Sequence, residues 1–278
     1  MSNYTQGHSA CTTATHQRRT AETDAAFLLP HINPTDKILD VGCGPGTITA
    51  GFAKYTTKGS VIGIDISDAI LQKAKAFVPE SAIPAEGQGS LKFQQGDILK
   101  GLPYEDNTFD IVFSSQVIGH MVPPDQPLAT IAEMRRVVKP GGIVACRDAA
   151  FQHFFPAHLD LDRLWVGNLN KVVYKGVSPS EAPGKNMLSL FRKAGFDVDG
   201  DKVVFGASAM VHSGPEERKW LAWRAAGQLK EGDPFRQSWL DAGTSEAEIE
   251  ETLEAVEKWC ETEDAWFAAL QCEMLGWK

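Results

Sequence analysis

The sequence predicts a doubly wound α/β fold, in which helices cover both faces of a seven-stranded, mainly parallel sheet with an antiparallel edge strand. Two observations lead to this prediction. Between Lys37 and Asp148, short apolar runs bounded by Gly, Pro and Asp alternate with segments of helical periodicity, which indicates βαβ units around a parallel sheet. The 278 residues, 43% of them hydrophobic, also suffice for one substantial core with insertions.

The elements of this first part follow one another in pairs. The predicted strands read KILDVG, VIGIDI, LKFQQGD, FDIVFSS and IVACRD, and the predicted helices span residues 47–55, 69–77 and 128–138. The segment Lys139-Pro140-Gly141-Gly142 ends the last helix, because proline cannot continue it, and the fifth strand follows. We therefore take residues 31–148 as the core that binds a cofactor.

The second half of the chain has a weaker pattern, which predicts insertions around the remaining strands. Aromatic residues accumulate over 149–185, and we interpret this segment as a cap over the carboxyl edge of the sheet. Residues 186–195 predict a helix ending at Gly195, 198–211 a long strand or a strand pair, and 265–277 a closing antiparallel strand. Ser245 and Glu248 match a capping box that begins an acidic, amphipathic helix. Residues 186–278 thus complete the same domain.

Composition excludes several classes of partner. The net charge is −9, but residues 244–264 contain nine acids and one base, so the remainder is nearly neutral and has no basic cluster for nucleic acid. No apolar run approaches the roughly 20 residues of a membrane span.

The five cysteines form no CxxC pair, which indicates reduced thiols and no metal site. The polar N-terminus predicts a cytoplasmic location. The oligomeric state stays open.

A glycine-rich turn follows the first predicted strand. In the segment Asp40-Val41-Gly42-Cys43-Gly44-Pro45-Gly46, the glycines allow the backbone to approach a ligand that a Cβ atom would exclude. A dinucleotide-binding turn has the spacing GxGxxG, whereas this turn has GxGxG. The spacing disfavours NAD and FAD.

From Lys37 to Asp148 the chain resembles the class I S-adenosylmethionine-dependent methyltransferases, whose fold is Rossmann-like and whose first motif ends a strand with an acid and continues GxGxG. The resemblance implies S-adenosyl-L-methionine as cofactor. Asp40 would help to hold its amino group, and Gly42, Cys43 and Gly44 would pass under its methionine part. Taken singly, Asp40 or the later Asp65 could instead be an acid that caps a loop.

Two further acids follow the second and third strands. Asp65, next to Ile66, is placed where a carboxylate accepts hydrogen bonds from both ribose hydroxyls. Asp97 and Ile98 match the family position that faces the adenine amino group. Ser114 and Gln116 end the fourth strand, where the family lines its reaction centre. The NPPY-type tetrapeptide of enzymes that methylate adenine or glutamine amides is absent from the sequence.

The N-terminal segment resembles the lid of glycine N-methyltransferase-like enzymes, in which a YxxG segment precedes an RTAE helix. Here these are Tyr4-Thr5-Gln6-Gly7 and Arg19-Thr20-Ala21-Glu22. The resemblance implies that residues 1–30 form lid helices, that Arg19 pairs with the cofactor carboxylate and that Tyr4 reaches the site.

A catalytic base is optional, because a methyl group on a sulfonium already has a good leaving group and mainly needs alignment and exclusion of water. His120, shortly after the fourth strand, is the best-placed candidate, and His8 and His153 are weaker ones. Asp148 either touches substrate or pairs with Arg147.

The cap aromatics Phe151, Phe155 and Trp165 form either an acceptor pocket or ordinary core. We predict direct in-line methylation of a small molecule. Because the core resembles the quinone-biosynthesis C-methyltransferases, a quinone or other lipophilic ring is an alternative acceptor. An NAD-dependent oxidoreductase and a non-catalytic cofactor-binding protein are the alternatives from other classes.

Overall fold

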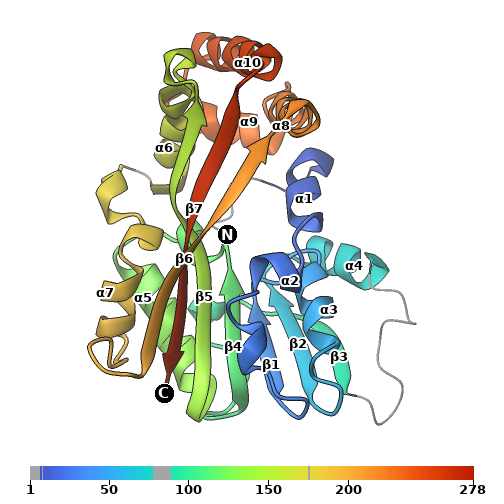
Figure 1. Cartoon of the computed structure of the whole chain (residues 1–278), viewed down its shortest axis with the longest axis vertical. Helices are drawn as coiled ribbons and strands as arrows, with labels where there is room; N and C mark the ends of the chain where they lie inside the picture. Colours follow the sequence, from blue (N-terminus) through green and yellow to red (C-terminus); the bar gives the residue numbers. More distant parts are fainter. Residues whose placement is uncertain (1–6, 8, 78–88, 175) are drawn as a thin grey trace.

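The computed structural model describes residues 7, 9–77, 89–174 and 176–278. Tyr4 and His8 lie outside the described residues. Seven strands form one sheet in the order β3-β2-β1-β4-β5-β7-β6, and helices lie on both of its faces (Figure 1). This confirms the predicted doubly wound α/β fold. The strands are β1 Lys37–Val41, β2 Ser60–Asp65, β3 Ser90–Gln95, β4 Phe109–Ser115, β5 Val138–Phe155, β6 Val203–Ser213 and β7 Trp266–Trp277.

The α-helices are distributed between the lower core and the upper end of the molecule in Figure 1. They are α1 Ala10–Gln17, α2 Ala21–Asp24, α3 Thr47–Ala53, α4 Asp68–Phe77, α5 Asp125–Val137, α6 Asn168–Tyr174, α7 Met187–Lys193, α8 Pro215–Gln228, α9 Pro234–Asp241 and α10 Glu246–Glu261. The predicted stop at Gly195 follows α7, and its φ of +91° is one that glycine adopts readily.

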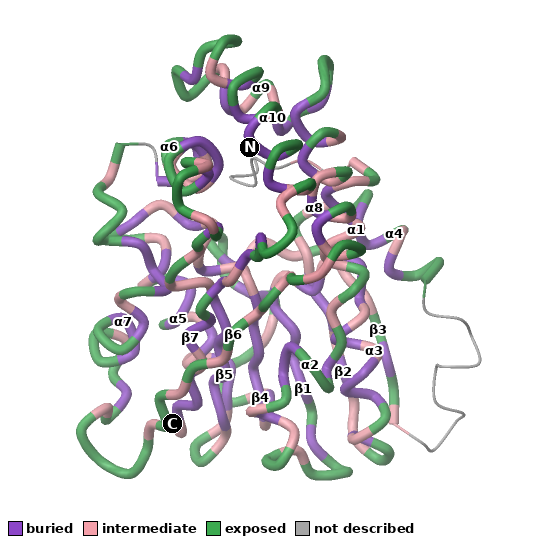
Figure 2. Tube along the Cα trace, turned by 45° about the horizontal axis from the view of Figure 1, so that its top comes forward, coloured by how far each residue is buried: buried purple, intermediate pink, exposed green. Residues whose placement is uncertain are grey.

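The central parallel strands have apolar residues on both faces because helices cover both faces. On one face, Val112, Ile131 and Phe191 belong to a buried cluster with α5 and α7, and on the other, Phe52 and Phe113 pack with α2 and α3. Figure 2 shows the central strands buried along most of their length, whereas the outer strand β6 is largely exposed or half-buried. Strands β1, β2 and β4 are thereby packed on both faces of the sheet.

β5 is longer than the sequence predicted. The expected strand ended at Asp148, but β5 continues to Phe155, so the first residues assigned to a cap insertion are strand. Their backbone groups pair with β7, which is antiparallel to β5 from Ile143↔Trp277 to Phe155↔Trp266. β7 is in turn antiparallel to β6, which forms the outer edge as one long strand.

The extended ends of β5, β6 and β7 carry a second packed unit, which we call the cap. Helices α6, α8, α9 and α10 pack there on the strand ends, together with the π-helical turn Asp162–Gly167. Their buried side chains, including Trp165, Trp239 and Trp259, form one apolar cluster with Phe154 and Phe267. The cap therefore draws on residues well beyond the predicted segment 149–185.

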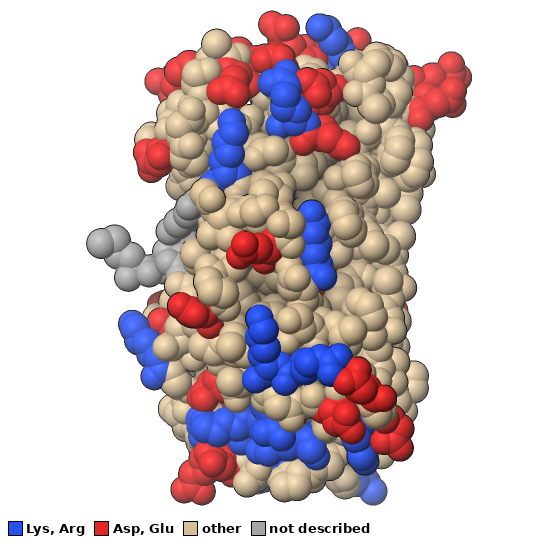
Figure 3. Space-filling model, turned by 90° about the vertical axis from the view of Figure 1, so that its left-hand side faces the viewer, with Lys and Arg blue, Asp and Glu red and all other residues tan. Residues whose placement is uncertain are grey.

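The acidic helix belongs to the cap and forms as predicted. Ser245 accepts a hydrogen bond from the N–H of Glu248, and the Glu248 side chain accepts one from the N–H of Ser245, which is a complete capping box. Ile249, Val256 and Trp259 face the cluster. Figure 3 shows acidic side chains concentrated at this end and a mixed band of bases and acids near the other. None of the described helices is both long and apolar enough to span a bilayer.

Candidate functional site

The glycine-rich turn lies where β1 ends, and it is tied to β2 by hydrogen bonds. Gly42 and Cys43 both donate their N–H groups to the Ile64 carbonyl, at 2.8 and 2.9 Å. Gly44 donates its N–H to Asp65 Oδ2 at 3.0 Å. Gly44 has a φ of +53°, and a Cβ atom built on it would meet nothing within 4 Å. This stretch of backbone therefore borders open space that a ligand can enter.

That space is a cavity at the carboxyl ends of β1, β2 and β4, which we call the first cavity. It is lined by every described residue of the predicted cofactor set except Ser114, together with Ser115, Val117 and His16. The predicted residues that line it are Arg19, Asp40, Gly42, Cys43, Gly44, Asp65, Ile66, Asp97, Ile98 and Gln116. The fold therefore gathers the acids that follow three successive strands at one place.

Ser114 is the one described residue of the predicted cofactor set that the structure does not bring to this cavity. Its side chain is fully buried and donates a hydrogen bond to Cys146 Sγ at 3.5 Å. Successive side chains of a strand point to opposite faces, so the neighbouring Ser115 lines the cavity instead.

The carboxyl groups of the first cavity differ in their surroundings. Asp40 is 2% exposed and accepts a hydrogen bond from Thr49 Oγ1 at 2.6 Å, and its burial, with a smaller contribution from the charge of Asp65, raises its pKa to about 7. Asp65 accepts the N–H groups of Gly44 and Ser67, which fix its side chain over the turn.

A second cavity lies beside the first and is enclosed by the cap. It is lined by aromatic side chains from the cap, including Trp165, Tyr174 and Trp259, and by Gly119 and Asp148 from the core. The two cavities share four lining residues, which are His16, Arg19, Gln116 and His120. A group bound in one can therefore meet a group bound in the other.

Two of the three aromatics predicted for an acceptor pocket lie elsewhere. Phe151 and Phe155 do not line the second cavity, and they are 46% and 36% exposed. Phe154, between them in sequence, lines the cavity because alternate residues of β5 face opposite sides. Trp165 lines the second cavity and also belongs to the buried apolar cluster of the cap.

Comparison with known proteins identifies the family. A methyltransferase-domain family profile matches residues 32–195. The chain is 57% identical to "Probable methyltransferase ltbC" of Aspergillus luteorubrus over 277 residues, covering 99% of this chain and 97% of that protein. It is 30% identical to a demethylmenaquinone methyltransferase of Bacillus cereus, over 70% of this chain and 84% of that protein. The crystal structure of the Bacillus subtilis YcgJ protein shares the fold, with a TM-score of 0.56 and 17% identity, covering 92% of this chain and 98% of that one.

The chain belongs to the class I S-adenosylmethionine-dependent methyltransferases. The family profile alone spans more than half of the chain, and the Aspergillus luteorubrus relative matches nearly all of it, cap included.

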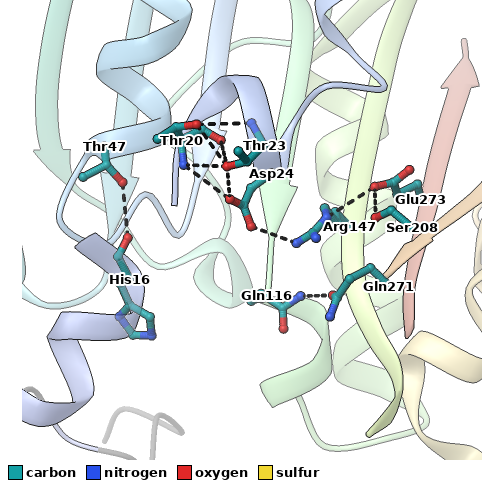
Figure 4. A network of polar contacts seen from close by, with 10 residues as sticks. All are labelled: His16, Thr20, Thr23, Asp24, Thr47, Gln116, Arg147, Ser208, Gln271 and Glu273. Carbon is teal, nitrogen blue, oxygen red and sulfur yellow. Dashed lines mark hydrogen bonds and ion pairs between the residues drawn. The ribbon is translucent and has the colours of Figure 1, made fainter. Parts of the chain in front are cut away.

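Arg147 and Asp148 of this methyltransferase do not form the ion pair that one interpretation expected. They point to opposite faces of β5. Arg147 donates to Asp24 of α2 at 3.1 Å and to Glu273 of β7 at 3.3 Å (Figure 4). Asp148 lines the second cavity and accepts the N–H of Gly119 at 2.9 Å. Arg147 thus fastens the N-terminal segment to the sheet, while Asp148 faces the cavity.

His120 lines both cavities of the methyltransferase. Burial, together with the positive charge of Arg19, lowers its pKa to about 4, so its imidazole is neutral at physiological pH. His153, the weaker candidate, lies on the outer face of β5, where its Nδ1 is 2.9 Å from Asp162 Oδ2, and lines neither cavity.

Two site residues of the methyltransferase have no local sequence signal. His16, on α1, lines both cavities, and its carbonyl accepts a hydrogen bond from Thr47 Oγ1 at 3.3 Å. Gln271, on β7, lines the second cavity and accepts a hydrogen bond from Gln116 Nε2 (Figure 4). Only the pairing of distant segments brings them to the site.

Proposed function

We propose that this methyltransferase binds S-adenosyl-L-methionine in the first cavity and transfers the methyl group to a small organic molecule in the second. One observation carries the proposal, namely that the two cavities meet at His16, Arg19, Gln116 and His120. A methyl donor and an acceptor must approach within bonding reach along one line, and adjoining cavities permit this.

The residues of the first cavity fit this cofactor. The open backbone at Gly44 admits the methionine part, and the buried carboxyl of Asp40 suits a positively charged amino group. Asp65 would accept the ribose hydroxyls with its remaining lone pairs, and Asp97 the adenine amino group, with Ile66 and Ile98 as apolar walls. Arg19 would pair with the cofactor carboxylate. When bound, the cofactor supplies a methyl group on a sulfonium.

The chain's own task is to align the acceptor and to exclude water. The aromatic residues of the cap cover the second cavity, and His120 and Gln116 lie where it joins the first. The neutral imidazole of His120 is suited to hydrogen bonding at this junction. The demethylmenaquinone methyltransferases among the relatives support an apolar ring as acceptor, which agrees with the aromatic walls.

Calorimetry tests the cofactor. We expect S-adenosylhomocysteine to bind the wild-type chain and NAD not to bind. Asp65→Asn should weaken S-adenosylhomocysteine binding about tenfold or more, because charged hydrogen bonds to the ribose are lost. Asp201→Asn, at an exposed position before β6, is the matched control and should bind like the wild type. Binding of NAD, or of neither compound, would remove the basis of the proposal.

A further inference from the structure

The second cavity contains a buried carboxyl group for which the proposed function has so far no use. Asp148 is 1% exposed. Its Oδ1 accepts the N–H of Gly119, whereas its Oδ2 is shielded from solvent and has no hydrogen-bond partner among the described residues. Leaving a buried acceptor unpaired is unfavourable, so such an atom calls for a functional explanation. A ligand in the cavity would supply the missing donor.

The groups that face Asp148 come from several elements. Burial raises its pKa to about 7, although the hydrogen bond from Gly119, the nearby backbone of Ile118 and the charges of Arg19 and Arg147 act in the opposite direction. Burial, with a smaller contribution from the charge of Asp148, raises the pKa values of Tyr174 of α6 and Cys272 of β7, so both side chains lie near Asp148. Asp148 can therefore take up and release a proton near neutral pH.

The remaining charges of the second cavity restrict the kind of acceptor. Its charged lining residues are Arg19, Arg224 and Asp148, and His120 beside them is neutral. With Arg19 engaged by the cofactor carboxylate, the guanidinium group of Arg224 balances the carboxyl group of Asp148, so the cavity has no excess of negative charge to attract a cationic amine and suits a neutral acceptor. Its walls also contain the aromatic side chains of Phe154, Trp165, Trp220, Trp259 and Phe267. Such walls suit a planar ring.

We propose that the acceptor is a planar ring bearing an acidic hydroxyl group, and that Oδ2 of Asp148 takes the hydroxyl proton during methyl transfer. This inference rests on the proposed function. The hydroxyl oxygen forms a bond to the methyl carbon, and the electron pair of its O–H bond stays on oxygen as the proton moves to Asp148. The electron pair of the broken carbon–sulfur bond stays on sulfur. The products are a methyl ether, S-adenosylhomocysteine and a protonated Asp148, which returns its proton to water.

A photoacid probe tests both parts of this inference. 2-Naphthol is a planar hydroxylated ring whose hydroxyl becomes a much stronger acid in the excited state. Because the free probe also gives this proton to water, emission is recorded with the protein in excess and the contribution of unbound probe is subtracted. The naphtholate emission that remains then reports a proton acceptor in contact with the bound probe. The full-length chain is first saturated with S-adenosylhomocysteine, and that binding is measured by calorimetry. We expect 2-naphthol to bind this complex, and the naphtholate emission to fall as the pH is lowered through about 7, where Asp148 becomes protonated.

The matched variants separate the roles. Asp148→Asn keeps an oxygen for the Gly119 N–H but cannot take a proton, so the naphtholate-to-naphthol emission ratio should fall about tenfold or more while S-adenosylhomocysteine still binds. Asp201→Asn should behave like the wild type. Undiminished naphtholate emission from Asp148→Asn would overturn the assignment of the proton acceptor. S-adenosylhomocysteine binding without 2-naphthol binding would overturn the acceptor class alone, and failure of S-adenosylhomocysteine to bind would instead remove the proposed function.

Discussion

At the scale of single residues, Asp40 and Asp148 share an unusual property, although they lie at different cavities. Both are almost fully buried, and burial raises the pKa of each to about 7. Asp40 faces the first cavity and Asp148 the second. Each carboxyl group is thus held where it can change its charge near neutral pH, and each change should be visible in a different measurement.

Cofactor binding should depend on pH through Asp40. A positively charged amino group prefers the ionised carboxylate, so S-adenosylhomocysteine should bind the wild type more tightly as the pH rises through about 7. Asp40→Asn should bind more weakly, by about tenfold, and with little pH dependence over that range. Calorimetry across this range measures both effects. The Asp148→Asn variant is the control and should keep the wild-type pH dependence; a flat profile in the wild type would contradict the prediction.

Stability should depend on pH through Asp148. Its pKa in the folded chain lies above the ordinary value of about 4, so the folded state binds the proton more readily than the unfolded state. The free energy of unfolding should therefore fall as the pH rises from about 4 to about 7. Asp148→Asn removes the part of this loss that comes from Asp148, while the part from Asp40 remains, and the variant should be more stable than the wild type above pH 7, by on the order of a few kcal/mol. Urea unfolding at pH values on either side of 7 measures the difference, and a destabilised variant at high pH would be the contrary result.

The residues of the first cavity were largely predictable because their signals are local. Asp40, Asp65 and Asp97 each follow a predicted strand, and parallel strands bring their carboxyl ends to one edge. Ser114 was misplaced by one residue, since the sequence fixes the strand more surely than the face on which each side chain lies. His16 and Gln271 were missed because only tertiary pairing brings them to the site.

At the scale of elements, the N-terminal segment is fastened to the sheet by a buried ion cluster. Arg147 of β5 contacts both Asp24 of α2 and Glu273 of β7, and Glu273 also accepts a hydrogen bond from Ser208 of β6 (Figure 4). The side chains of Arg147, Asp24 and Glu273 are only 5%, 11% and 14% exposed. The cluster holds α2 against the sheet, and Arg19 lies just before α2.

Arg147→Met should destabilise the fold strongly, because it leaves two buried carboxylates without their cation. We expect a loss of about 3–5 kcal/mol in the free energy of unfolding, measured with urea. Adding Asp24→Asn and Glu273→Gln to the same chain should recover a large part of this loss, since the uncompensated charges disappear. If the triple variant were no more stable than Arg147→Met, lost packing rather than buried charge would be the cause.

The start of α10 offers a milder test at the same scale. Ser245→Ala removes the side chain that accepts the Glu248 N–H, and it should cost about 1 kcal/mol of stability. Urea unfolding measures this, with Ser90→Ala at an exposed position as the control. An effect equal to that of the control would show that the capping box does not contribute.

The elements differ in how far the sequence could define them. The Ser245 capping box was predictable because its signal lies within four residues. The extension of β5 to Phe155 was not predictable in this way, although Phe151, His153 and Phe155 alternate with inward-facing residues as in a strand. That alternation becomes a strand only through its partner, β7, which follows more than 100 residues later in the chain.

At the scale of the whole molecule, the long strands join the core to the cap. β5 pairs with β4 in the core, and its far end lies in the cap beside β7. The second cavity exists only because these strands hold the cap over the first cavity, with lining residues from Thr15 to Gln271. No local pattern contains such information, so the sequence predicted most residues of the first cavity but only a few of the second, among them His120, Asp148 and Trp165.

This continuity predicts that the core and the cap unfold together. Trp239 is fully buried in the cap cluster, packs edge-on against Trp165 and lines neither cavity. Trp239→Ala should lower the free energy of unfolding by about 3–5 kcal/mol through the cavity that it leaves. Because strands shared by both units transmit the loss, tryptophan fluorescence and S-adenosylhomocysteine binding should be lost in one transition, at a lower urea concentration than in the wild type. The contrary result would be a change in tryptophan fluorescence at a urea concentration where the variant still binds S-adenosylhomocysteine. The cap would then be a separately folding unit, and the second cavity could open without disturbing the first.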